Sequence, residues 1–270
     1  MVNTISFLNA PLFNIFEMTI NIAVFGDIHG NQDLMYESAR NWETNNKQSI
    51  DMILQVGDFE TIRNEDDFKH YHAPEKYHHI SDIAQYCSGA KRAPVFTVFI
   101  GGNHEAWGVL KKTSSGGFVC PNIYHLGRSN VIDVRGVSIG GLTGIYSPDK
   151  YKTPLEEEPG YDWKYYREAE VKNLEGKKMD ILLLHEWIMP ISRVEIVKKV
   201  NVPENCMAHN YVSPAFNLVN KIQPKYVFMG HMHSAYVEGN LNGTKIFGLC
   251  ELDKKRDPLS MKVLSIDSTE

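Results

Sequence analysis

Five short polar segments, each placed directly after an apolar run, constrain this chain more than any other feature of its sequence. They occupy residues 26–30, 57–58, 102–105, 184–186 and 230–233, and they supply carboxylate, carboxamide and imidazole groups. The apolar runs before them are mostly β-branched, which is typical of strands buried on both faces. Ligand-binding side chains usually follow the carboxyl ends of such strands. We therefore expect the five segments to converge on one site.

The rest of the pattern predicts an α/β (α+β) fold, a two-sheet β-sandwich flanked by helices. Apolar runs alternate with a helical stretch in the first half of the chain, and hairpin signals follow in the second half. The dipeptide Asn242-Gly243 lies between two such runs and is a strong signal for a two-residue hairpin. The expected strands lie at 20–25, 52–56, 95–100, 131–134, 137–139, 181–184, 226–229, 237–241 and 244–249, and the expected helices at 31–45 and 165–174.

Two segments fall outside this regular pattern. Residues 1–19 are mildly apolar and carry no basic leader, so we expect an N-terminal extension before a single domain at 20–270. Met18 lies just before the first expected strand and is a candidate for the native start, which mass spectrometry of the N-terminus would test. Residues 146–162 combine prolines, charges and tyrosines in a long expected loop. Loops of this length are often functional, so the segment is either a substrate lid or a connection.

Composition narrows the class of protein. The net charge of −5 over 270 residues argues against a strongly basic protein that binds nucleic acid non-specifically. No apolar run is long enough to span a membrane, so no membrane partner is expected. The cysteines Cys87, Cys120, Cys206 and Cys250 form no C-x-x-C pair, which predicts mostly buried free thiols in a reducing compartment. We expect an intracellular protein, cytoplasmic or nuclear, that is a monomer.

The five segments contain the donors that a pair of divalent metal ions requires. Asp27 and His29 are two residues apart, as are His231 and His233, so each pair can be directed at the ions together. Asp58 is the natural candidate for a carboxylate that touches both ions. Mixed nitrogen and oxygen donors favour Mn²⁺, Fe²⁺ or Zn²⁺ over Ca²⁺ or Mg²⁺. Two such ions about 3.5–4 Å apart are the arrangement that cleaves phosphate esters.

Four more residues of these segments have predicted roles. Asn103 offers a neutral carbonyl oxygen, and His185 offers a further imidazole to the same ion pair. His104 follows Asn103, and its imidazole can donate a proton to a leaving oxygen. Glu105 is expected to orient an imidazole. The remaining histidines are expected to be satisfied polar groups: His70, His72, His78, His79, His125 and His209.

Together these residues resemble a known family, the calcineurin-like metallophosphoesterases. The shared pattern is D-x-H, G-D, G-N-H-E, H and G-H-x-H, and the likeness covers residues 21–266. The resemblance implies the fold of that family, a catalytic domain at 20–270 and two divalent metal ions. It also implies roles for individual residues. One ion would be held by Asp27, His29, Asp58 and His233, the other by Asp58, Asn103, His185 and His231, with His104 as acid or transition-state stabiliser.

A narrower resemblance rests on stretches that metal binding does not need. Residues 55–67, 74–77, 88–95, 99–106, 116–124, 140–146 and 252–254 look like those of the RNA lariat debranching enzymes. The resemblance implies a substrate, branched or lariat RNA, hydrolysed at its 2′-5′ phosphodiester. It also places residues 146–162 where those enzymes have a lariat recognition loop. Asp27 departs from the pattern, because the eukaryotic enzymes resemble Gly-Cys-Cys-His-Gly at this motif.

The predicted substrate contacts are cationic and aromatic. Lys150, Lys152 and Tyr146 in the expected loop can contact phosphate and stack on splayed bases, which is how single-stranded RNA is usually held. Arg63 and Lys76 are further candidates for phosphate or RNA contacts. The three glutamates at 156–158 argue instead for a solvated loop.

The expected reaction is metal-assisted hydrolysis. A hydroxide that bridges the two ions attacks phosphorus in line, Asn103 helps to hold the non-bridging oxygens, and His104 protonates the departing 2′-oxygen. The alternative is a broader metallophosphodiesterase that acts on small nucleotides or other phosphodiesters. A phosphoprotein phosphatase is disfavoured, because Asp58 is followed by Phe-Glu-Thr-Ile and the phosphate-gripping arginine of G-D-x-V-D-R-G is absent. A non-catalytic scaffold is disfavoured because no predicted ligand is missing.

Overall fold

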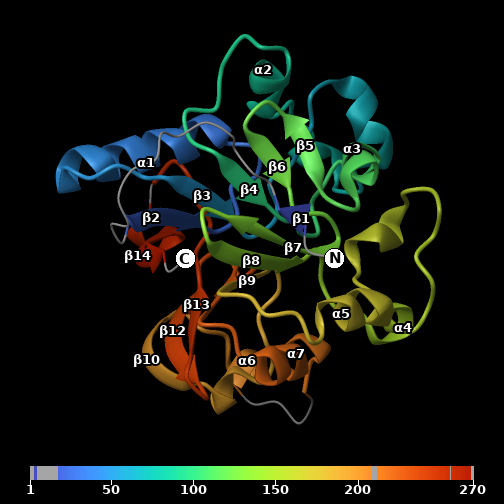
Figure 1. The fold of residues 1–270 in the computed structure, drawn as a ribbon. Coiled ribbons are helices and arrows are strands. Elements are labelled where there is room, and N and C mark those ends of the chain that lie inside the picture. The colour runs from blue at the N-terminus through green and yellow to red at the C-terminus, as the bar shows by residue number, and fades with distance from the viewer. Residues whose placement is uncertain (1–2, 5–17, 208–211, 256, 269–270) are drawn as a thin grey trace.

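The structure, a computed structural model, describes residues 3–4, 18–207, 212–255 and 257–268. Within these ranges two β-sheets lie face to face with helices on their outer sides, which confirms the predicted architecture (Figure 1). The first sheet has the strand order β14 (Met261–Ser268), β2 (Met18–Phe25), β3 (Met52–Gln55), β4 (Thr97–Phe99), β6 (Ile123–His125) and β5 (Gly117–Cys120). The second has the order β1 (Asn3–Thr4), β7 (Ser129–Val134), β8 (Val137–Leu142), β9 (Ile181–Leu184), β11 (Tyr226–Met229), β13 (Thr244–Gly248), β12 (Tyr236–Leu241) and β10 (Glu195–Val200).

Helices cover the outer face of each sheet. Figure 1 shows α1 beside the first sheet, and α6 and α7 on the far side of the second. The helices are α1 (Gln32–Asn46), α2 (Ile83–Cys87), α3 (Trp107–Leu110), α4 (Pro148–Tyr151), α5 (Glu168–Leu174), α6 (Glu204–Met207) and α7 (Pro214–Ile222). Short 3-10 turns occupy Glu65–His70, Glu75–Tyr77, Lys111–Thr113, Tyr161–Lys164, Ile191–Arg193 and Pro258–Ser260.

The alternation of side chains in the central strands explains how the layers pack. In β2, Ile22 and Val24 enter the core between the two sheets, whereas Ala23 and Phe25 pack against the outer helices. Strand β9 divides its apolar side chains in the same way, between the inner core and the helices α5 and α7. A strand that is buried on both faces reads as a continuous apolar run, which is why these strands could be predicted.

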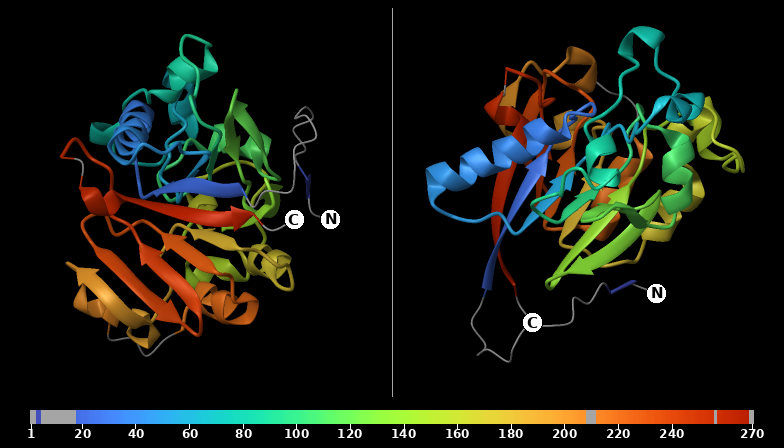
Figure 2. Two further views of the ribbon diagram at one scale, coloured as in Figure 1. Left: turned by 60° about the vertical axis from the view of Figure 1, so that its left-hand side comes forward. Right: turned by 90° about the horizontal axis from the view of Figure 1, so that it is seen from above.

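Several boundaries differ from the prediction for local reasons. The helix expected at 165–174 begins only at Glu168, because Arg167 and Glu170 form a capping box. Strand β14 has no counterpart in the prediction, although it pairs antiparallel with β2 along its whole length (Figure 2). The predicted hairpin is confirmed: Asn242 and Gly243 have positive φ angles of 52° and 95° and join β12 to β13.

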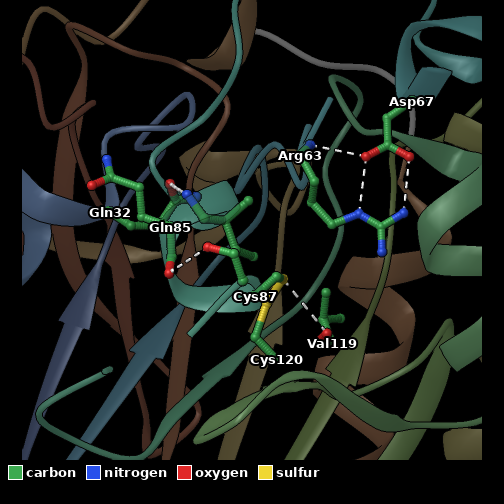
Figure 3. Close-up of a disulfide and its surroundings, with 9 residues drawn as sticks. Gln32, Arg63, Asp67, Gln85, Cys87, Val119 and Cys120 are labelled. Carbon is green, nitrogen blue, oxygen red and sulfur yellow. Dashed lines mark hydrogen bonds and ion pairs between the residues drawn. A yellow bond between two sulfur atoms is a disulfide. The ribbon is translucent and has the colours of Figure 1, made fainter. Parts of the chain in front are cut away.

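The cysteines include one departure from the expectation of free thiols. Cys87 at the end of α2 and Cys120 at the end of β5 form a disulfide, and their Cα atoms are 4.7 Å apart (Figure 3). The expectation is wrong for this pair, because the packing of α2 against β5 brings together residues that are 33 positions apart in the chain. Cys206 and Cys250 are buried free thiols, as predicted.

Some predictions fall on residues that the structure does not describe. His209 and most of the expected extension at 1–19 lie outside the described ranges. Of that extension, Asn3–Thr4 pairs in parallel with β7, and Met18 is the first residue of β2. No helix in the described part of the chain is both long and apolar enough to cross a membrane.

His125 in β6 is a fully buried histidine. Its Nδ1 lies 2.9 Å from the hydroxyl of Thr113, and its ring stacks on Phe99. Its Nε2 has no hydrogen-bond partner among the described residues. Burial, together with the charge of Arg128, lowers the pKa of His125 from 6.5 to about 3. The folded protein therefore holds this imidazole neutral.

This burial predicts a loss of stability in acid. The contribution of His125 is fully present above pH 6.5, and it is lost as the pH falls toward 3, because the unfolded chain binds the proton first. Between pH 7 and pH 5 the free energy of unfolding should fall by about 2 kcal/mol from this group alone. His125→Phe and His125→Leu should both remove that part of the decrease, as measured by urea denaturation at the two pH values. An unchanged decrease in both variants would contradict the assignment.

Candidate active site

Four of the predicted ligands meet beyond the carboxyl ends of β2, β3 and β11. One donor atom from each of Asp27, His29, Asp58 and His233 lies within 4.8 Å of the others. Nε2 of His29 is 3.9 Å from Oδ2 of Asp58, and Nε2 of His233 is 3.4 Å from Oδ2 of Asp27. Two carboxylates and two imidazoles in this arrangement can hold one divalent ion. We call these four residues the first ligand set.

The other predicted ligands lie against the second oxygen of Asp58. Nε2 of His185 is 3.5 Å from Oδ1 of Asp58 and 3.0 Å from Oδ1 of Asn103. The ring centroid of His231 is 5.0 Å from that of His185. Nδ1 of His185 lies 2.9 Å from the carbonyl oxygen of Val56, which leaves Nε2 to face the other donors. We call Asp58, Asn103, His185 and His231 the second ligand set, which is a prediction and shares Asp58 with the first.

The surroundings of the Asp58 carboxylate indicate that these donors suit a bound cation. Its side chain is fully buried, and Oδ2 has no hydrogen-bond partner among the described residues. The other oxygen, Oδ1, accepts the backbone amide of His104 at 2.7 Å. A buried carboxylate oxygen without a partner is costly unless a positive charge lies against it. The residues present therefore fit divalent metal ions.

The proton affinities of the site follow from its buried carboxylates. Burial opposes protonation of His29, but the hydrogen bond to Glu60 and the charge of Asp58 raise the pKa of His29 to about 10. Burial also opposes protonation of His185, and the charges of Asp58 and Asp27 raise its pKa to about 9. Burial by itself would raise the pKa of Asp58, but the charge and hydrogen bond of His185 hold that pKa well below its usual range. All three shifts have the same cause: the buried carboxylates favour a positively charged group beside them.

Two glycines allow the carboxylates to approach the backbone closely. A Cβ atom on Gly102 would lie 2.2 Å from Oδ1 of Asp58, and one on Gly230 would lie 2.2 Å from Oδ1 of Asp27. The amide of His231 donates to the same Asp27 oxygen at 2.9 Å. Any side chain larger than hydrogen at these two glycines would displace a ligand, which explains their place in the motifs.

The segment that carries His231 and His233 is turned rather than extended. Both residues have positive φ angles, 70° and 41°. Their rings therefore diverge, so that His231 faces His185 whereas His233 faces His29 at a centroid distance of 5.0 Å. In an extended segment the two side chains would point the same way. The turn instead divides the two imidazoles between the two ligand sets.

The residue that orients His29 is one that the motif pattern did not single out. Nδ1 of His29 is 2.8 Å from Oε1 of Glu60, which also accepts the hydroxyl of Tyr71 at 2.9 Å. Glu105, which we expected in such a role, instead accepts the backbone amides of Phe59 and Glu60. In the sequence, Glu60 stands out only by its place two residues after Asp58. That place does not reveal the contact with His29, which is visible only in the folded loop.

We expect Glu60→Ala to weaken metal binding roughly ten- to a hundredfold, because it removes the group that holds the tautomer and orientation of His29. The measurement is isothermal titration of the metal-free protein with Mn²⁺. Glu75→Ala, at an exposed glutamate of the Glu75–Tyr77 turn, is the matched control and should bind as the wild type does. Equal affinity in both variants would show that Glu60 does not position a ligand.

A cavity of about 460 Å³ opens beside the first ligand set. Its lining consists of His29, Glu60, Tyr71, Lys76, Tyr77, His79, His104, His233 and Glu251. The ring centroid of His104 is 5.7 Å from that of His29, so the predicted acid shares this cavity with a metal ligand. Nδ1 of His233 is 3.2 Å from a carboxylate oxygen of Glu251, which the sequence pattern also missed.

The predicted substrate contacts lie in different places. Lys76 lines the cavity. Arg63 does not, and its Nε and Nη2 donate to the carboxylate of Asp67 at 2.9 Å each (Figure 3). The guanidinium group of Arg63 is therefore paired with a carboxylate only four residues away in the chain. Lys76 therefore lies closest to the predicted chemistry, and the role of Arg63 stays a prediction.

The expected loop at 146–162 also lies outside the cavity lining. The backbone amide of Tyr146 donates to the buried carboxylate of Glu186, and its ring packs against Tyr151. Lys150 forms an ion pair with Asp162, and Lys152 is exposed. Helix α4 lies within this segment. A contact between this loop and a substrate stays a prediction.

Comparison with known proteins agrees with this geometry. The calcineurin-like phosphoesterase family profile matches residues 20–235. The chain belongs to the calcineurin-like phosphoesterase family. That membership confirms the resemblance drawn from the motifs, and it implies divalent metal ions.

Relatives of this calcineurin-like phosphoesterase carry a more specific name. Lariat debranching enzyme A of Xenopus laevis is 38% identical over 228 residues, which cover 79% of this chain and 43% of that protein. The lariat debranching enzyme of Gallus gallus is 35% identical over 262 residues, covering 92% and 48%. That of Schizosaccharomyces pombe is 35% identical over 231 residues, covering 80% and 49%. The chain spans about half the length of the curated relatives it matches.

One solved crystal structure supports the fold alone. It is 15% identical and superimposes with a TM-score of 0.56 over 93% of this chain and 100% of its own. At that identity the likeness says nothing about the substrate.

Proposed function

We propose that this calcineurin-like phosphoesterase is a metal-dependent phosphodiesterase that hydrolyses the 2′-5′ bond at the branch point of lariat RNA. The observation that carries the proposal is the buried carboxylate of Asp58, which two ligand sets share beside His104 and an open cavity. The names of its relatives, at 32–38% identity, favour branched RNA over other phosphodiesters. The catalytic domain in this proposal is 20–270.

Both ligand sets have a place in the proposal. Asp27, His29, Asp58 and His233 would hold one divalent ion, and Asp58, Asn103, His185 and His231 would hold the other. Mn²⁺, Fe²⁺ and Zn²⁺ suit these mixed nitrogen and oxygen donors. When bound, such ions supply a water of lowered pKa and charge that stabilises the phosphate in the transition state.

The chain itself supplies positioning and proton transfer. The amide of His104 is held by Asp58, which places the His104 imidazole at the cavity rather than among the ligands. We assign it the transfer of a proton to the departing 2′-oxygen. Asn103 lies beside His185 and holds a non-bridging phosphate oxygen through its amide group. Glu60 keeps His29 in one orientation throughout the reaction.

The proposal is tested with a synthetic branched RNA and its linear 3′-5′ counterpart, incubated with the Mn²⁺- or Fe²⁺-loaded protein. We expect selective release of the 2′-linked strand, and we expect that release to disappear in Asn103→Ala. Cleavage of both RNAs at equal rates would replace the proposal with a broader metallophosphodiesterase. The absence of any cleavage, with metal bound, would refute both.

A broader metallophosphodiesterase for small nucleotides is the second candidate, and one observation favours it. No residue of the loop at 146–162 is among the described residues that line the cavity, and Lys150 is already paired with Asp162. A cavity that this loop does not enclose suits a small diester as well as a large RNA.

A further inference from the structure

We propose that Tyr77 and Lys76 form a nucleobase subsite in the wall of the cavity, next to the phosphate that is cleaved. This inference rests on the proposed function, since it concerns the substrate of the same site. It places the selection of one nucleotide in residues 71–79, which we call the 71–79 segment. Four residues of the 71–79 segment line the cavity: Tyr71, Lys76, Tyr77 and His79.

Tyr77 has the exposure and the surroundings of a stacking platform. Its side chain is 51% exposed, and it lines the same cavity as His29 and His104. The ammonium group of Lys76 lies 4.7 Å from the centroid of the Tyr77 ring. Aromatic rings stack on nucleobases, and a neighbouring cation attracts the phosphate of the same nucleotide. The pair therefore offers one surface for a base and one charge for its backbone.

The imidazole of His79 lies between Tyr77 and a predicted metal ligand. Nδ1 of His79 lies 3.0 Å from the carbonyl oxygen of Tyr77, and its Nε2 lies 3.1 Å from the carbonyl oxygen of His29. His79 thus lies between the backbone of the platform and the backbone of a ligand in the first set, and it donates to both carbonyl oxygens at once when it is an imidazolium. In this proposal His79 is a positioning residue, because it acts on the substrate through Tyr77.

Two further contacts hold the 71–79 segment in place. The hydroxyl of Tyr71 donates to Glu60, the residue that orients His29. The ring of His78 stacks on Phe68 at a centroid distance of 4.6 Å and an interplanar angle of 6°. These contacts tie the segment to the loop that carries the ligands, so a base on Tyr77 would lie at a fixed offset from the reacting phosphate.

The kinetic test uses a short branched RNA and two versions of it, one abasic at the branch residue and one abasic at the 2′-linked residue. Tyr77→Leu should raise KM for the intact substrate roughly ten- to a hundredfold while kcat is retained. Tyr77→Phe should behave as the wild type, because it keeps the ring. With one of the two abasic substrates, the KM values of the wild type and of Tyr77→Leu should become equal.

Phe118→Leu is the control for this test. It removes an aromatic ring that is 49% exposed and outside the cavity lining, and it should leave KM and kcat unchanged.

A spectroscopic test needs no turnover. A branched RNA that carries 2-aminopurine at the sensitive position is titrated with the metal-free protein, and stacking on Tyr77 should quench its fluorescence. Quenching should persist in Tyr77→Phe and disappear in Tyr77→Leu.

The outcomes separate the two proposals. If the wild type debranches RNA and Tyr77→Leu leaves both KM and quenching unchanged, the subsite is refuted and the proposed function stands. If the KM effect persists on both abasic substrates, Tyr77 does not bind a base. If the wild type cleaves no branched RNA, the proposed function fails. Loss of quenching in Tyr77→Leu would then still support a base on Tyr77, and equal quenching in both proteins would refute it.

Discussion

Asp58→Asn should lower kcat at least about a thousandfold. Asp58 is the carboxylate that both ligand sets share, and its Oδ2 has no hydrogen-bond partner among the described residues. Metal ions contribute several kcal/mol to transition states of this kind, and each 1.36 kcal/mol is a factor of ten in rate. Loss of the shared charge should weaken both ion sites at once.

Metal content measured by mass spectrometry, together with thermal unfolding, checks this prediction. Asp58→Asn should retain its fold, because the amide oxygen can still accept the His104 amide that now binds Oδ1. It should lose the rise in Tm that added metal gives the wild type. Asp66→Asn, at a side chain that is 84% exposed, is the matched control and should keep full activity. A fully metal-loaded Asp58→Asn protein would show that the two ligand sets do not share this residue.

His104→Ala should lower kcat on branched RNA roughly a hundred- to ten-thousandfold, the usual contribution of a positioned general acid. His104 lines the cavity but offers no atom to the first ligand set. Metal content should therefore stay at the wild-type level. An aryl diester needs little help from an acid, because its phenolate leaves unprotonated, so with that substrate the loss should be much smaller.

The comparison of the two substrates decides whether His104 is an acid. Lys69→Ala, at a side chain that is 72% exposed and outside the cavity lining, serves as the control and should affect neither substrate. An equal loss on branched RNA and on the aryl diester would contradict proton donation. In that case His104 would act by stabilising charge on the phosphate.

The candidate ligand residues could be brought together from the sequence because each one lies within a few residues of the end of a buried strand. Asp27 follows β2, His185 follows β9 and His231 follows β11, and these strands are continuous apolar runs. Parallel pairing of β2 with β3, and of β9 with β11, then brings the polar residues to neighbouring strand ends. Strand β14 could not be predicted in the same way, because polar Lys262 and Ser265 interrupt its apolar pattern.

The partners of the ligands could not be predicted from motif spacing. Glu60 and Glu105 are both carboxylates within a few residues of a ligand, and only the fold shows that Glu60 reaches His29. Its positive φ of 55° turns the chain there, whereas Glu105 binds the backbone of the same loop. The pairing of Arg63 with Asp67 was likewise outside the predicted pattern.

The sequence by itself determined the family, the two-sheet architecture and the candidate ligand residues, because these depend on local periodicity and on short motifs at strand ends. Only the tertiary structure decided which segment forms the cavity wall, and it is the 71–79 segment and not the loop at 146–162. It also decided that Cys87 meets Cys120 and that His79 links Tyr77 to His29. Each of these contacts joins residues of irregular loops or of distant elements, and their geometry depends on how the whole chain packs and not on neighbours in sequence.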